Sequence, residues 1–156
     1  MDKVTKHYSI AMSQVELSSK ESSVSKIYPV MDIAIFGTPS LLDIINLMND
    51  IKSSIKEIEG DYISITDLSK LIINKFFSKI ILSGMESTYK SLVSVGRQSI
   101  ISFVVLGETQ EYKDTLSNTL HNINEQKIDT EKDYKYRYYF VKSKEEIKAI
   151  AQQILM

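Results

Sequence analysis

The sequence predicts an α/β domain built on a mixed, mainly parallel β-sheet, with about four helices and an N-terminal antiparallel strand. From residue 27 onward, short apolar runs alternate four times with segments whose apolar residues recur every three or four positions. Such alternation with short connections is typical of parallel strands joined by right-handed crossovers. The chain has 156 residues, of which 43% are hydrophobic and 25% charged, as in one ordinary domain. We expect residues 1–7 to be a flexible N-terminus and residues 8–156 to form this single domain.

The first two predicted strands form an antiparallel pair. Residues 8–17 alternate weakly between apolar and polar side chains, and a serine-rich turn separates them from the apolar run at 27–36. Gly37, Thr38 and Pro39 follow directly. This order predicts a strand-to-helix junction with Thr38 as the N-cap and Pro39 at the first helical position.

The next segment, residues 41–59, is predicted to be an amphipathic helix. Gly60 stands where a left-handed helix cap belongs. One apolar stripe at spacings of three and four supports the assignment, formed by Leu41, Ile44, Ile45, Met48, Ile51, Ile55 and Ile58. The short β-branched run at 62–67 then predicts the third strand.

The second half of the chain repeats this alternation. Residues 74–96 have a helical period that closes at Gly96, and Gly84 inside it indicates a kink or close packing. The nearly continuous apolar run at 100–106 suits a central strand that is covered on both faces. The remaining predicted elements are a helix from Thr109 to Ile123, a strand at 134–141 and a last helix that starts with a capping box of Ser143 and Glu146.

The sequence lacks the residues and motifs that several classes of function require. The chain has no cysteine, which excludes disulfides, thiolate metal sites and cysteine nucleophiles. Neither glycine-rich phosphate-binding motif occurs, and His7 and His121 have no acidic neighbours at ligand spacing, so we expect no cofactor and no metal. No run approaches the ~20 apolar residues of a membrane span, and no apolar signal core follows the N-terminus. We therefore expect a cytoplasmic protein without a membrane span.

The basic and aromatic run at 134–140 is typical of nucleic-acid surfaces, where aromatic rings stack on bases and cations neutralise phosphates. In a strand, however, its aromatic and basic side chains divide largely between two faces. One face can then pack on helices while the other carries charge. Because the formal net charge is -1, from 19 basic and 20 acidic residues, we expect packing here and no nucleic acid.

The segment Asp67-Leu68-Ser69 ends a predicted strand and precedes a short loop and a long helix. Together with the leading strand pair and the helix that begins Ser143-Lys144-Glu145-Glu146, it resembles the STAS fold of anti-sigma-factor antagonists. It is more closely similar to the divergent STAS-like domains found as small stand-alone bacterial proteins. The resemblance covers residues 8–156 and rests on element order more than on motif.

In that family the loop typically runs D-L-S, a few apolar residues, then D-S-[ST]-G, whose first serine is phosphorylated by a partner kinase. In this sequence Lys75 replaces the acid, Phe76 the phosphorylated serine and Ser78 the glycine. The resemblance therefore implies a docking domain that lacks the serine switch. Its partner-binding residues would be Asp67, Ser69, Asn74, Lys75 and Phe76.

The resemblance implies a non-enzymatic interaction module in bacterial signalling or regulation, whose partner is another protein, kinase-like or otherwise regulatory. One alternative is a small-molecule or lipid-binding carrier with an apolar pocket near Phe76, Phe77 and Ile80. Another is an enzyme of unrecognised type that uses Asp67, Ser69 and Lys75. The sequence leaves the oligomeric state open, with a homodimer among the options.

Overall fold

The computed structural model of the chain describes residues 2–19, 21, 23–72, 83–84, 86–88, 90–92, 94–107, 118 and 138–156. Its centre is a six-stranded sheet whose strands lie in sequence order. They are β1 (Lys3–Val4), β2 (Tyr8–Ser18), β3 (Ser25–Ile35), β4 (Ile63–Asp67), β5 (Ile101–Val105) and β6 (Tyr138–Val141). The pairs β1·β2 and β2·β3 are antiparallel, whereas β3, β4, β5 and β6 are parallel. The α/β class and the mixed sheet with antiparallel strands at its N-terminus are confirmed.

The helical elements follow the predicted order where the structure describes them. They are α1 (Leu41–Ile55), the 3-10 turn η1 (Lys144–Glu146) and α4 (Ile147–Leu155). The described residues between 83 and 92, and residue 94, are helical, and Gly96 has φ 69 where the predicted second helix was expected to close. The predicted helix at 109–123 lies outside the described residues except for Asn118, as does the 134–137 half of the last predicted strand.

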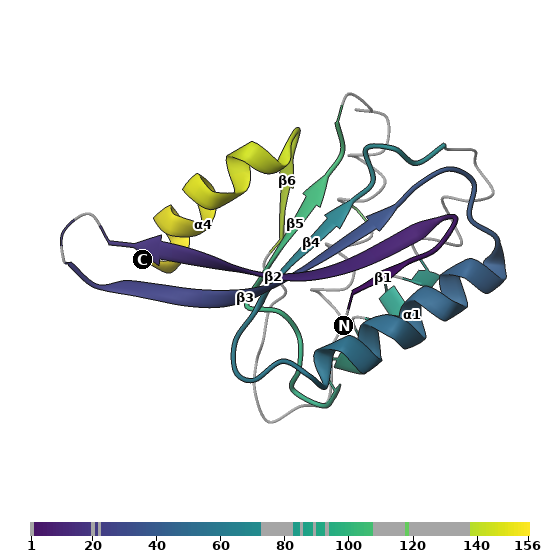
Figure 1. The fold of residues 1–156 in the computed structure, drawn as a ribbon, viewed down its shortest axis with the longest axis horizontal. Coiled ribbons are helices and arrows are strands. Elements are labelled where there is room, and N and C mark those ends of the chain that lie inside the picture. Colours follow the sequence, from purple (N-terminus) through teal and green to yellow (C-terminus); the bar gives the residue numbers. More distant parts are fainter. Residues whose placement is uncertain are drawn as a thin grey trace.

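Helices α1 and α4 cover opposite faces of the sheet (Figure 1). The buried residues that the structure describes accordingly form two apolar cores. Successive side chains of a strand point to opposite faces. In β5, accordingly, Val104 packs in the core under α1, and its neighbour Phe103 packs in the core under α4. Both side chains are 0% exposed, which confirms that the apolar run at 100–106 forms a strand covered on both faces.

The N-cap of helix α1 lies two residues later in the junction than the sequence predicted. The N-cap is Ser40, and the prediction that Thr38 would cap the helix is wrong. Ser40 Oγ accepts a hydrogen bond from Asp43 N (3.1 Å), and the Asp43 carboxylate accepts one from Ser40 N (2.7 Å). A Thr38 cap would have Leu41 in place of the reciprocating acid, so the Ser40–Asp43 box satisfies one more backbone donor.

The buried face of α1 also differs from the predicted stripe. Ile44, Ile51 and Ile55 are buried as expected, and Leu47 joins them. Leu41 is 58% exposed and Ile45 is 44% exposed, so these two leave the core side of the helix. Residues 44, 47, 51 and 55 form a narrower stripe, because each helical step of one residue rotates a side chain by about 100°.

Part of the segment that was expected to be flexible has a defined place at the sheet edge. Lys3 and Val4 form β1 and pair with Ile10 and Ser9 of β2. Thr5 turns the chain between the two strands, because its hydroxyl accepts a hydrogen bond from Tyr8 N at 3.1 Å.

The C-terminal end of α1 is closed by Arg97, which is far away in the sequence. The Arg97 guanidinium donates hydrogen bonds to the carbonyl oxygens of Ile55 (3.2 Å) and Ile58 (2.6 Å). The Tyr62 hydroxyl in turn donates to the Arg97 carbonyl at 2.7 Å. A cation is favourable here because the last carbonyls of a helix carry partial negative charge.

Replacing Arg97 with Met is expected to lower the free energy of unfolding by about 1.5–3 kcal/mol, because these charge-assisted hydrogen bonds are lost while most of the aliphatic stem is kept. Denaturant titration measures the change. Arg97→Lys should lose less, since it keeps the cation at the helix end. Equal losses for Met and Lys would show that packing of the stem, not the charge, stabilises this end of α1.

Candidate functional site at the carboxyl edge of the sheet

The carboxyl ends of the parallel strands present a fixed polar turn, which follows β4. Asp67 Oδ1 accepts hydrogen bonds from Ser69 N (2.9 Å) and from Ser69 Oγ (2.6 Å). An aspartate that binds its own backbone two residues ahead forms a local turn without help from a neighbouring element. Leu68 N donates to the Val105 carbonyl at 2.8 Å and thereby ties the turn to the end of β5. Ligands of open α/β sheets characteristically bind at this edge.

The turn is held from both sides by glycines. Gly37 N donates to the Lys70 carbonyl (3.1 Å), and the Gly37 carbonyl accepts from Ile72 N (2.9 Å). On the other side, a Cβ at Gly107 would lie 3.1 Å from Ser69 Cβ, and Gly107 has φ 63. Both the left-handed backbone and the close approach favour glycine at 107. The segment from Asp67 to Ile72 is therefore seated between the ends of β3 and β5.

Lys144 brings a charge from the start of η1 to the same edge. Its Nζ lies 2.7 Å from Asp32 Oδ2 and 3.8 Å from Asp67 Oδ2. Asp32 and Asp67 lie on the face that α4 covers. Each stands two positions after a residue of the core under α4, Val30 and Ile65 respectively, and residues two apart in a strand point to the same face. The predicted capping box of Ser143 and Glu146 is present and sets the start of this turn.

Two carboxylates and one ammonium give this trio a net negative charge. The side chains of Lys144 and Asp32 are 45% and 24% exposed, so water screens their attraction and the pair contributes about 0–1 kcal/mol. Asp32 Oδ1 is buried, and no residue that the structure describes donates a hydrogen bond to it. Among these described residues there is also no group of three or more side chains able to hold a metal ion. The trio presents charged groups for polar recognition at this edge.

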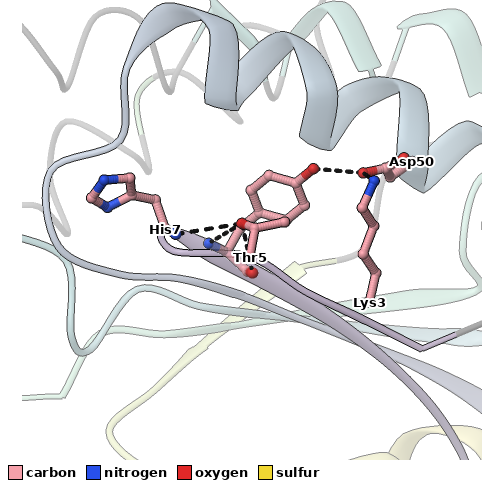
Figure 2. A network of polar contacts seen from close by, with 5 residues as sticks. Lys3, Thr5, His7 and Asp50 are labelled. Atoms are coloured by element: carbon pink, nitrogen blue, oxygen red, sulfur yellow. Dashed lines mark hydrogen bonds and ion pairs between the residues drawn. The ribbon is translucent and has the colours of Figure 1, made fainter.

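A second polar network joins the first strands to α1 on the other face of the sheet. Figure 2 shows the Lys3 side chain of β1 and the Asp50 side chain of α1 pointing toward each other. Asp50 Oδ2 accepts a hydrogen bond from the Tyr8 hydroxyl at 2.5 Å and lies 2.8 Å from Lys3 Nζ. Because Tyr8 is buried and its hydroxyl is paired, this network anchors the helix and is not an open site.

The network shifts the pKa values of its two acidic groups, Tyr8 and Asp50, in opposite directions. Burial raises the pKa of Tyr8 to about 12, assisted by the hydrogen bond to Asp50 and by the Asp50 charge. Burial alone would raise the pKa of Asp50, but hydrogen bonds from Lys3 and Tyr8 and the Lys3 charge outweigh it and lower that pKa. The stability that Asp50 contributes is therefore present above its ordinary pKa of 3.8 and is lost as the pH falls through the lowered value.

At alkaline pH, Tyr8 is expected to make stability fall as the pH rises, whereas the contribution of Asp50 falls as the pH decreases. The folded state favours the protonated phenol, so its contribution is fully present below pH 10.0 and is lost as the pH rises toward 12. We expect the free energy of unfolding to fall by about 2–3 kcal/mol across this range on account of Tyr8. Urea titrations of the wild type and Tyr8→Phe at a series of pH values isolate this term from other tyrosines and lysines. Parallel stability curves for the two proteins would contradict it.

The structure brings together two of the five predicted partner-binding residues. Asp67 and Ser69 form the turn at the carboxyl edge. Asn74, Lys75 and Phe76 lie outside the described residues, as do Phe77 and Ile80 of the alternative apolar pocket. Ser69 in the turn and Lys70 directly after it are exposed.

Sequence reasoning did not single out Asp32 and Lys144 as site residues. For Asp32 a signal was present, since it is the one charged residue in the apolar run at 27–36. Lys144 gives no such signal, because a lysine in a capping box is ordinary helix-start chemistry. Its partners follow only from the path of the chain from β6 back across the sheet.

The helices that the structure describes include none that is both long and apolar enough to cross a membrane. The exposed large aliphatic residues include three at the carboxyl edge: Leu41, Leu42 and Ile72. No protein-family model, no curated protein and no solved structure matches this chain.

Proposed function

We propose that this chain is a STAS-like, non-enzymatic interaction module that docks another protein at the carboxyl edge of its sheet. The observation that carries the proposal is the exposure of three large aliphatic side chains there. Leu41 is 58% exposed, Leu42 64% and Ile72 63%. Exposed apolar side chains that gather at one place, rather than singly, mark interaction surfaces.

The three side chains belong to one end of the molecule because Gly37 connects their segments. Ile72 N donates to the Gly37 carbonyl at 2.9 Å, and α1 begins at Leu41, four residues after Gly37. The Asp67–Ser69 turn and Lys144 provide polar groups at the same edge. An apolar centre with polar groups beside it is the usual composition of a protein interface.

The STAS-like assignment is supported by element order. An antiparallel strand pair leads into parallel strands, the Asp67-Leu68-Ser69 turn ends one of them, and a capped helix follows the last strand. We propose docking without the serine switch. The Ser69 hydroxyl donates to Asp67 at 2.6 Å, and position 76, which aligns with the phosphorylated serine, is a phenylalanine. Such a module would serve cytoplasmic bacterial regulation.

Photo-crosslinking tests this surface in the cells that make the protein. A photoreactive amino acid at Ile72 is expected to yield a discrete crosslinked partner, identified by mass spectrometry. The matched control is Val95, which is 68% exposed and lies at the end of the predicted second helix, away from the turn. The same probe at Val95 should not give that product.

A second substitution separates docking from chance contact. Leu42→Glu places a charge in the proposed apolar centre, and we expect it to reduce the Ile72 crosslink by about tenfold or more, as loss of about 1.4 kcal/mol of binding free energy would. Melting temperature should stay unchanged because Leu42 is exposed. Identical products at Ile72 and Val95, or a crosslink indifferent to Leu42→Glu, would reject the carboxyl edge as the docking surface.

A further inference from the structure

Among the strands that the structure describes, β2 has the longest outer edge without a strand beside it. β2 has eleven residues, and β1 pairs only with Ser9 and Ile10. Within the described part of the chain, no strand pairs with the outer side of β2 beyond these two residues. An exposed strand edge presents unpaired N–H and C=O groups and is a template for another strand.

Hydrogen bonds identify which backbone groups of β2 face outward. Successive residues of a strand direct their N–H and C=O to opposite neighbours. Odd-numbered positions face β3, since the His7 carbonyl accepts from Phe36 N at 3.0 Å and Ser19 N donates to Val24 O at 3.1 Å. Even-numbered positions face outward, as the bond from Thr5 N to Tyr8 O shows.

Side chains cap both ends of this outer edge. Met12 N donates to the Asp2 carboxylate at 2.8 Å, and Ser18 N donates to Gln152 Oε1 of α4 at 3.4 Å. Between these caps, the outward groups belong to Gln14 and Glu16, whose side chains are exposed. We call residues 13–17 the β2 window.

The β2–β3 hairpin is protected against strand addition at the free edge of β3 but not at the β2 window. Beyond Val30, β3 has no pairing with β4, so the β2–β3 hairpin extends past the other strands, as Figure 1 shows. On that edge Pro29 removes a backbone donor, a common device against strand addition. The window contains no proline and no lysine, and β2 pairs with β3 in one unbroken register from Tyr8 to Ser18.

We propose that the β2 window binds the β2 window of a second copy of this chain, antiparallel and around a two-fold axis at Val15. This register places Gln14 of each copy opposite Glu16 of the other copy, so two such pairs form. Each such pair exchanges two backbone hydrogen bonds, because both residues face outward. The Gln14 side-chain amide can donate to the Glu16 carboxylate across the strands, which is a favourable cross-strand pair.

The neighbouring registers are disfavoured by side chains that already bind the backbone of β2. An axis at Glu16 would set two carboxylates opposite each other and would use Ser18 N, which Gln152 already binds. An axis at Gln14 would use Met12 N, which Asp2 already binds. The Val15 register alone uses only backbone groups that no described residue binds, and it leaves the carboxyl edge open for a partner protein.

The dimer is expected to be weak and reversible. Five residues from each copy bury far less than the ~1,600 Å² of a standard interface. Crosslinking is therefore the decisive measurement, and the absence of native cysteine makes it clean. In a non-hydrogen-bonded antiparallel pair the Cα atoms are about 4.5 Å apart, which lies within the range that a disulfide spans.

Val15→Cys in the full chain is expected to form a disulfide-linked dimer under mild oxidation, measured on non-reducing gels and by intact mass. Ile27→Cys on the other strand of the hairpin is the matched control. Ile27 is 58% exposed whereas Val15 is half-buried, so random collision would favour the control. We expect the Val15→Cys protein to crosslink faster by tenfold or more.

Adding Gln14→Pro to Val15→Cys removes one outward donor without breaking the β2–β3 ladder. It is expected to abolish the rapid crosslink while leaving the melting temperature unchanged. Crosslinking of Val15→Cys no faster than that of Ile27→Cys would overturn the proposal. A rapid crosslink that survives Gln14→Pro in a folded protein would overturn the backbone-pairing register as well.

Discussion

Replacing Ile51 with Asp is expected to unfold the domain. Ile51 is 8% exposed on the core face of α1, in the cluster that also contains Ile44 and Val104. An unpaired carboxylate there loses its hydration without gaining a partner, which costs several kcal/mol. A typical domain has only about 5–15 kcal/mol of stability in total. Circular dichroism and the melting temperature of the purified variant measure the loss.

The same substitution on the outer side of α1 provides the control. Ile45 is 44% exposed on the same helix, so Ile45→Asp should keep the folded spectrum and change the free energy of unfolding by about 1 kcal/mol or less. This contrast distinguishes the observed stripe from the one expected from sequence, in which both residues belonged to the core. A folded Ile51→Asp protein with unchanged melting would refute the assigned face.

Phe103→Ala is expected to have the largest effect on the second core, under α4. The Phe103 ring is 0% exposed and lies with Ile63, Ile101 and Ile147 in that cluster. Truncation loses the buried apolar surface and leaves a cavity, which together cost about 3–5 kcal/mol. Urea titration of the variant gives the value directly.

A volume-conserving change at the same position tests the cause. Phe103→Leu keeps most of the apolar volume and is expected to cost clearly less than Phe103→Ala. Tyr139, whose ring lies 6.0 Å from that of Phe103 and is 37% exposed, should tolerate truncation better. If Phe103→Ala and Tyr139→Ala destabilised equally, burial would not explain the role of Phe103.

The two proposed surfaces use different residues and can be tested separately. Docking at the carboxyl edge depends on Leu42 and Ile72, whereas self-association depends on the β2 window at the opposite end of the hairpin. Leu42→Glu should leave the Val15→Cys crosslink intact, and Gln14→Pro should leave the Ile72 crosslink intact. Either test can therefore fail without changing the result of the other.

The sequence alone determined the order and type of most described elements from β2 onward, because periodicity and breakers are local signals. It did not identify β1, which lies in the segment that was expected to be flexible. The alternation in residues 8–17, the run at 100–106 and the glycine at 96 each identified their element. Gly60 has a positive φ but lies beyond the C-cap of α1 at Lys56, so the prediction that Gly60 would cap this helix is wrong. Boundaries were less well determined. The N-cap at Ser40 depended on reciprocal bonding with Asp43, and the end of α1 at Ile55 involves Arg97, which reaches its carbonyls from beyond β4.

Only the tertiary structure decided which charged groups meet and which edges stay open. Asp32, Asp67 and Lys144 are separated by up to 112 positions, and the sheet order and the start of η1 bring them together. The resemblance pointed to Asp67 and Ser69, yet it gave no reason to include Lys144. Likewise, no local pattern reveals that Asp2 and Gln152 cap the two ends of the β2 window. Such contacts depend on how distant segments pack, since local periodicity specifies an element's buried side but not its neighbours.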